Sequence, residues 1–226
     1  MPVAMKEGRR LATLFGSQLG QLGGGDETTA YYTEVMNARI LHHHGAIMQS
    51  ADDVFLAEFN DAANAVNCAI DAQERFAQHN KLHLDKSTIE VKIAIHFGEM
   101  FFREGKLGGS GVDITTELLS IVPTKRIYIT REVFARVRML LPLQLEDIGK
   151  KNIGSLTEPK ELLSVSWQAV TGNLEASLKK LREDDLQRAT SLSSKLGFGA
   201  STRAVPVIIF LLLIFLIFLT KILKWL

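Results

Sequence analysis

The sequence contains a single cysteine, Cys68, in a chain of 226 residues. One cysteine excludes any disulfide within the chain and fits a reducing compartment. Because Cys68 lies in the run AANAVNCAIDAQERF, which has helical apolar spacing, we expect it to be a small buried residue of the core.

The sequence also lacks an excess of either charge. The formal net charge is +1, and without Lys221 and Lys224 the remaining 24 basic and 25 acidic residues give residues 1–203 a net charge of −1. This balance provides no basic field, so nucleic acid is not an expected partner.

No sustained apolar stretch follows the basic residues of MPVAMKEGRRLATLF, so we expect no N-terminal signal peptide. Apolar residues are instead concentrated in residues 204–226, AVPVIIFLLLIFLIFLTKILKWL, whose only charges are Lys221 and Lys224. This composition predicts one C-terminal transmembrane helix, with the two lysines reaching the headgroups. The predicted localisation is therefore a single-pass membrane protein whose N-terminal domain lies in the cytoplasm.

Residues 173–203 form the expected connection between the soluble part and the membrane. Leucines recur on one helical face through LEASLKKLREDDLQRATSLSSKL, which predicts a helical juxtamembrane stalk. The repeat is too short to establish a coiled coil, so a plain stalk and a dimerising stalk both remain open. The predicted domains are residues 1–172, the linker 173–203 and the membrane helix 204–226.

The element order in residues 1–172 predicts an α+β domain with helices packed on one sheet, because helices and strands do not alternate regularly. Apolar and polar residues alternate in AIMQS and VFLAEF, which predicts two strands meeting at Asp52 and Asp53. We expect two strands around Gly98 in IEVKIAIHFGEMFFREG. A helix is expected in DETTAYYTEVMNARILHHHG, with Asp26, Thr28 or Thr29 as its N-cap and Gly45 as its C-terminal stop. Further helices are expected in DAANAVNCAIDAQERFAQHN, GVDITTELLSIV and REVFARVRMLL.

Several of these segments together resemble the class III nucleotide cyclase homology domain. The segments are HHHGAIMQSADDVFLAEFNDAANAVNCAIDAQERF, then VKIAIHFGEMFF, LGGSGVDITTELLSI, RIYIT, LEDIG and LTEP, in the family's order and spacing over most of residues 11–170. The resemblance implies a ferredoxin-like, palm-type fold with an antiparallel-rich sheet. It also implies sites at the interface of a homodimer or heterodimer formed by this domain.

In that family, two acidic residues bind two divalent cations that activate the nucleotide triphosphate. The second metal acid corresponds to Asp53, which is present. The first corresponds to Ser17 when Gly20 is aligned with the family's glycine, and no acid lies between Gly8 and Gly25. A hydroxyl cannot supply the missing charge, so Asp53 is expected to be a remnant, with Mg²⁺ or Mn²⁺ relevant only if residual activity exists.

The family's other functional positions are also altered. The Asn that orients the ribose corresponds to Asp113, and the Arg that stabilises the transition state corresponds to Glu117. The residues that recognise the base correspond to Gln49 and Ser110. Replacing a cation by Glu117 changes attraction into repulsion next to the phosphates, which costs about several kcal/mol at an effective dielectric constant of roughly 20.

The histidines have two candidate roles, as metal ligands and as packed residues of the core. Consecutive residues on a helix point about 100° apart, so His42, His43 and His44 are predicted to form a solvated helix end and not a metal cluster. His96 lies in an apolar strand and is predicted to be a packed histidine.

Three functions remain open at this point. The first is a catalytically inactive, membrane-anchored cyclase-like protein that acts as a dimerising scaffold or regulatory partner of an unknown protein. The second is a residual nucleotide cyclase or nucleotide-binding sensor that uses Asp53. The third is a membrane-acting protein whose cyclase-like head controls assembly of the C-terminal helix.

Overall fold

A computed structural model of the protein describes residues 8–20, 25–51, 53–83, 88–103, 106–154 and 158–168, together with Glu183 and Gln187. The elements that it contains follow the order expected from the sequence. They are β1 (Gly8–Leu19), α1 (Asp26–His42), β2 (Ala46–Ala51), β3 (Val54–Phe59), α2 (Ala62–Leu82), β4 (Val91–Arg103), β5 (Lys106–Gly108), α3 (Ser110–Ile121), β6 (Ile127–Thr130), α4 (Arg131–Val137), β7 (Leu145–Lys151) and β8 (Lys160–Val165).

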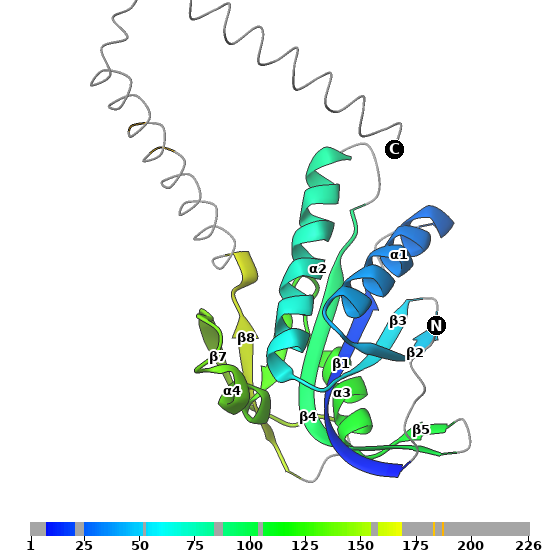
Figure 1. The fold of residues 1–226 in the computed structure, drawn as a ribbon, viewed down its shortest axis with the longest axis vertical. Coiled ribbons are helices and arrows are strands. Elements are labelled where there is room, and N and C mark those ends of the chain that lie inside the picture. The colour runs from blue at the N-terminus through cyan, green and yellow to red at the C-terminus, as the bar shows by residue number, and fades with distance from the viewer. Residues whose placement is uncertain are drawn as a thin grey trace, which may run out of the picture. The chain divides into compact units, whose positions relative to one another are not determined.

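The strands form one sheet in the order β2-β3-β1-β4-β6-β8-β7, with β5 paired to the end of β4 (Figure 1). The pairs are antiparallel except for β4 and β6, which run parallel. The first four strands and two helices follow the βαββαβ order of a ferredoxin-like unit. The predicted α+β class and antiparallel-rich, palm-type sheet are therefore confirmed.

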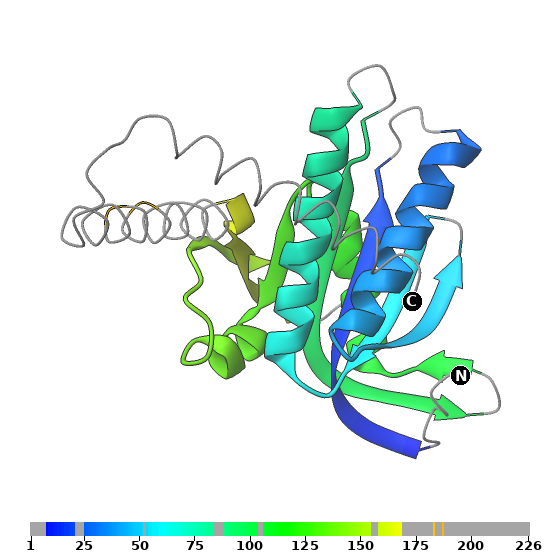
Figure 2. The same ribbon diagram turned by 45° about the horizontal axis from the view of Figure 1, so that its top comes forward.

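Helices cover both faces of this sheet. Buried residues of α1, α2 and α4 pack in one large core against β1, β3 and β4, and Figure 2 shows α1 and α2 side by side on that face. Helix α3 packs on the other face, where Ile114, Leu118 and Leu119 meet Ala94 of β4 and Leu162 of β8. Cys68 is fully buried in the larger core, as its sequence context predicts.

Strands β1 and β4 pair along their whole lengths, from Gly8 opposite Phe102 to Leu19 opposite Val91. The prediction of two strands around Gly98 is wrong, because β4 continues through this residue. A Cβ atom at Gly98 would lie 2.7 Å from His96 Nε2 and 3.0 Å from the Cα atom of Gly111 at the start of α3. The glycine thus permits close packing of α3 on the strand and does not mark a turn.

The ends of α1 also differ from the prediction. The N-cap is Gly25, without a side-chain hydrogen bond, and the helix ends at His42. The left-handed backbone after the helix is adopted by His44 at φ 61°. Gly45 is needed for space, since a Cβ atom there would lie 2.5 Å from Phe59 Cζ.

Among the described residues, no helix combines the length and the apolar composition that a bilayer crossing requires. The predicted stalk (173–203), apart from Glu183 and Gln187, and the predicted span (204–226) lie outside the described residues.

Candidate functional site

The position that corresponds to the first metal acid lies in the interior of the helical layer. Neighbouring residues of a strand point to opposite faces of the sheet. Gly16 faces α3, where a Cβ atom would lie 3.0 Å from Leu119 Cδ1, so Ser17 faces α1. Ser17 is 0% exposed, and its hydroxyl shares a hydrogen bond of 2.8 Å with the hydroxyl of Tyr32.

The electrostatics of this pair are those of a buried neutral contact. Burial raises the pKa of Tyr32 well above its usual range; the Ser17 hydrogen bond lowers it slightly, and the Asp53 carboxylate raises it further. The phenol therefore stays protonated, and the serine oxygen is already engaged. Ser17 is not placed as a ligand for a cation.

Asp53 lies at the turn between β2 and β3 and is half-buried. Its carboxylate oxygen Oδ2 accepts a hydrogen bond of 3.1 Å from Gln18 Nε2. Its main-chain oxygen accepts a second, of 2.8 Å, from the Leu19 amide. The side chain and the backbone of Asp53 are thus both tied to the end of β1, and the neighbouring Asp52 lies outside the described residues.

The positions that correspond to the ribose-orienting and transition-state residues lie on α3. Asp113 is exposed in the first turn of this helix, and Glu117 follows one turn later. The Glu117 carboxylate lies against Gly154, where a Cβ atom would overlap it. Glu117 is therefore packed against the segment that follows β7.

The two positions that correspond to base recognition are both on the surface. Gln49 is exposed on β2, and Ser110 is exposed as the first residue of α3, after Gly109 at φ 115°. Exposure leaves both side chains able to contact a ligand. Neither side chain carries a charge.

In the described part of the chain, the two positions that the resemblance matches to metal acids hold one carboxylate, that of Asp53. Two divalent cations close together require several oxygen ligands with negative charge. Within the described residues, Asp53 belongs to no group of three or more His, Cys, Asp or Glu side chains whose donor atoms converge.

Sequence reasoning missed two residues of this region, Gln18 and Tyr32. Because side chains of a strand alternate between the two faces of the sheet, burial of Ser17 on one face places Gln18 on the other. The contact between Gln18 and Asp53 could then be inferred once β1 is known to pair with β3. Tyr32 is fifteen residues from Ser17, and no local pattern links the two.

His96 is a packed residue, as the sequence predicts. It is 3% exposed, and its Nδ1 atom shares a hydrogen bond of 3.0 Å with Thr130 Oγ1. Burial lowers its pKa to about 4, while the nearby Glu132 carboxylate opposes that shift and Lys160 adds to it. The ring is therefore neutral near pH 7.

Comparison with known sequences gives limited support. No family model matches the chain. A protein of Rhizobium meliloti (strain 1021), named "Putative adenylate cyclase 3", is 22% identical over 130 residues, which are 58% of this chain. The chain spans only 22% of the length of that relative.

Solved structures give a clearer result. The adenylate/guanylate cyclase/hydrolase of Silicibacter pomeroyi is similar with a TM-score of 0.61 at 20% identity, over 70% of this chain and 97% of that one. The adenylyl cyclase CyaB of P. aeruginosa is similar with a TM-score of 0.62 at 17% identity, over 71% and 96% of the two chains. The described domain thus has the fold of class III adenylate/guanylate cyclase domains.

Proposed function

We propose that the protein is a catalytically inactive cyclase-like protein that acts as a dimerising scaffold or regulatory partner at a membrane. The observation that carries this proposal is the buried Ser17, which shares its hydroxyl with Tyr32 where a cyclase needs a metal acid. The fold is retained, but the carboxylate that would hold the metal ions together with Asp53 is replaced by the hydroxyl of Ser17.

The α3 residues support the same conclusion independently. A transition state that develops negative charge is stabilised by donors and cations, and losing one such group typically costs about 10²–10³ in rate. Glu117 instead contributes a carboxylate, held against Gly154. In an asymmetric cyclase of this family, one half carries both metal acids and the other half carries the arginine. This chain has neither set complete, so a single partner chain would have to supply both the missing metal acid and the arginine.

The assembly and the location are parts of the proposal that rest on sequence. Pairing through the cyclase-like domain is expected from the family resemblance, as a homodimer or a heterodimer. Residues 204–226 would anchor the chain, and the helical linker 173–203 would place the domain next to the cytoplasmic face.

Catalysis is tested with the full-length protein purified in detergent. Incubation with Mn²⁺ and either ATP or GTP should give no cyclic nucleotide above the level of a protein-free blank. Product that appears with wild type and disappears with Asp53→Ala would refute inactivity. A matched control, Asp147→Ala, changes an exposed acid on β7 that is not one of the positions matched to the family's metal, ribose, transition-state or base residues.

The scaffold role has its own readout. Co-purification from detergent-solubilised native membranes should recover a defined partner, and cross-linking of the purified chain should show whether it also pairs with itself. If neither a partner nor a dimer is recovered, the scaffold role is refuted.

A second candidate is a nucleotide-binding sensor, which the retained Asp53 favours. The carboxylate is half-buried and oriented by Gln18, so it could bind one cation of a cation–nucleotide complex. Binding of Mn²⁺–ATP without turnover, lost in Asp53→Ala and kept in Asp147→Ala, would select this function.

A further inference from the structure

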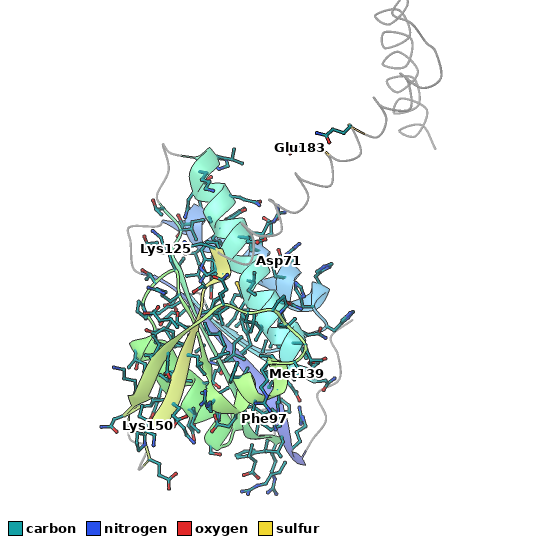
Figure 3. All side chains as sticks on the ribbon, turned by 90° about the vertical axis from the view of Figure 1, so that its left-hand side faces the viewer. Asp71, Phe97, Lys125, Met139, Lys150 and Glu183 are labelled. Atoms are coloured by element: carbon teal, nitrogen blue, oxygen red, sulfur yellow. The ribbon has the colours of Figure 1, made fainter. Side chains whose placement is uncertain are left out.

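A cluster of metal-ligating side chains lies away from the cyclase-like site, at the junction of α1 and α2. His42 and His43 at the end of α1 meet Asp71 of α2, and one donor atom from each lies within 4.8 Å of the others. Figure 3 labels Asp71 on α2, the helix that packs beside α1. The sequence predicted a solvated end for these histidines, and it gave no sign of the aspartate that joins them.

The contacts of Asp71 leave one of its oxygens available. Its Oδ2 atom receives a hydrogen bond of 3.0 Å from Arg39 and lies 3.1 Å from His43 Nε2. In the described part of the chain no contact is made by Oδ1. A cation could therefore bind Oδ1 while Arg39 continues to orient the carboxylate through Oδ2.

The surroundings suit a cation and its ligands. Ligating carboxylates are commonly fixed by a second group, and Arg39 already takes that role here. The site lies at the C-terminus of α1, where the helix dipole places partial negative charge. His43 and Asp71 are half-buried, with side chains 19% and 27% exposed, so their positions are restrained by packing.

The ligand types select the metal. Two imidazoles and one carboxylate suit borderline cations such as Zn²⁺, whereas Mg²⁺ and Ca²⁺ prefer oxygen ligands. We propose that His42, His43 and Asp71 form a zinc-type site, completed by water as the fourth ligand. Occupation would replace the hydrogen bond between His43 and Asp71 with two metal bonds.

Such a site would couple two parts of the domain. The residues that follow His43 lead through Gly45 directly into β2, and β2 ends at the turn that carries Asp53. A bound cation would tie this connection to the middle of α2. It would stabilise the folded state by mass action, because a ligand that binds only the native protein shifts the unfolding equilibrium.

Other potential ligands can be separated from the site. Cys68 is buried in the core, and burial raises the pKa of its thiol well above the usual range, so it does not compete as a thiolate. His79 and His83 stack on one another at a ring-centroid distance of 4.2 Å and form a different pair on α2. His44 is exposed next to the site and is not one of its three ligands.

The test uses the full chain in detergent, stripped with a chelator and then dialysed. Zn²⁺ is added in a calorimetric titration and in thermal unfolding, and Mg²⁺ is added in parallel. We expect Zn²⁺ to bind with one-to-one stoichiometry and to raise the melting temperature, whereas Mg²⁺ should do neither. His42→Ala and His43→Gln should each weaken zinc binding roughly tenfold or more.

The controls distinguish a site from surface binding. His42 is exposed, so His42→Ala should leave the metal-free melting temperature unchanged while zinc affinity falls. His44→Asn, which tolerates the left-handed backbone at φ 61°, and His83→Gln should keep wild-type affinity. Absence of zinc binding in wild type, or equal affinity in wild type and His42→Ala, would overturn the proposal.

Discussion

The hydroxyl oxygens of Ser17 and Tyr32 lie 2.8 Å apart, and both side chains are 0% exposed. This contact joins β1, near its C-terminal end, to α1 at the position that the family resemblance matches to a metal acid. A serine with this partner serves the packing of the helical layer. Substitutions in this pair are therefore expected to change the stability of the fold before they change any activity.

Replacing one member of this pair leaves the other without its partner. Ser17→Ala and Tyr32→Phe should each lower the free energy of unfolding by about 1–3 kcal/mol, because a buried hydroxyl loses its hydrogen bond. The double variant should cost less than the sum of the two, with a coupling energy of about 1 kcal/mol. Urea unfolding of the four proteins measures this, and strictly additive costs would show that the hydrogen bond contributes nothing.

Restoring the missing acid should not restore a cyclase. Ser17→Asp places a carboxylate in a buried site beside Tyr32, so we expect the free energy of unfolding to fall by about 3 kcal/mol or more. No cyclic nucleotide should form with Mn²⁺ and ATP or GTP. As a control at an exposed position, Asp113→Asn should change the free energy of unfolding by less than about 0.5 kcal/mol. A folded Ser17→Asp variant with Mn²⁺-dependent product would show that the missing acid alone causes the inactivity, and it would contradict the expectation that Glu117 also prevents catalysis.

The parts of the fold that sequence predicted are those with a local signal. Apolar spacing predicted α2, because it records which side chains of that helix face the core, and the short apolar segments on either side of Asp52 and Asp53 predicted β2 and β3. Gly98 was misinterpreted for the opposite reason. A glycine that breaks a strand and one that makes room for a helix look alike in sequence, and only the packing of α3 distinguishes them.

The candidate sites show the same limit. Asp53 and Ser17 could be placed from aligned motifs, since the order of the strands is shared with a known family. The contacts Ser17–Tyr32 and His43–Asp71 join residues fifteen and twenty-eight positions apart. Such contacts depend on how α1 packs against β1 and α2, which no local pattern encodes.

Gly45 gives a steric prediction. A Cβ atom there would lie 2.5 Å and 2.7 Å from two ring atoms of Phe59, which is 1% exposed and cannot move freely. Gly45→Ala should therefore lower the free energy of unfolding by about 1–3 kcal/mol through overpacking. The same substitution should cost less in a Phe59→Leu background, as measured by urea unfolding. An equal cost in both backgrounds would place the strain somewhere other than this ring.

His96 gives a prediction for pH. Because burial lowers its pKa to about 4 from the usual histidine value of 6.5, the unfolded chain binds a proton more readily than the folded protein. The stability contributed by the neutral ring is therefore complete above about pH 6.5 and is lost as the pH falls toward about 4. Between about pH 7.5 and about pH 5, this group alone should lower the free energy of unfolding by about 2 kcal/mol.

The contribution of His96 can be separated from that of other groups. In the folded state the pKa values of Glu90 and Glu132 lie below the usual glutamate value of 4.5, that of Glu90 mainly through its hydrogen bond with Lys125. Their effect therefore develops mostly at lower pH. His96→Gln should be less stable than wild type at about pH 7.5 because it disturbs packing, yet should lose less stability on acidification. His44→Asn should keep the wild-type loss. If His96→Gln retains the full loss between about pH 7.5 and about pH 5, another group is responsible, and His96 is not held neutral by the fold.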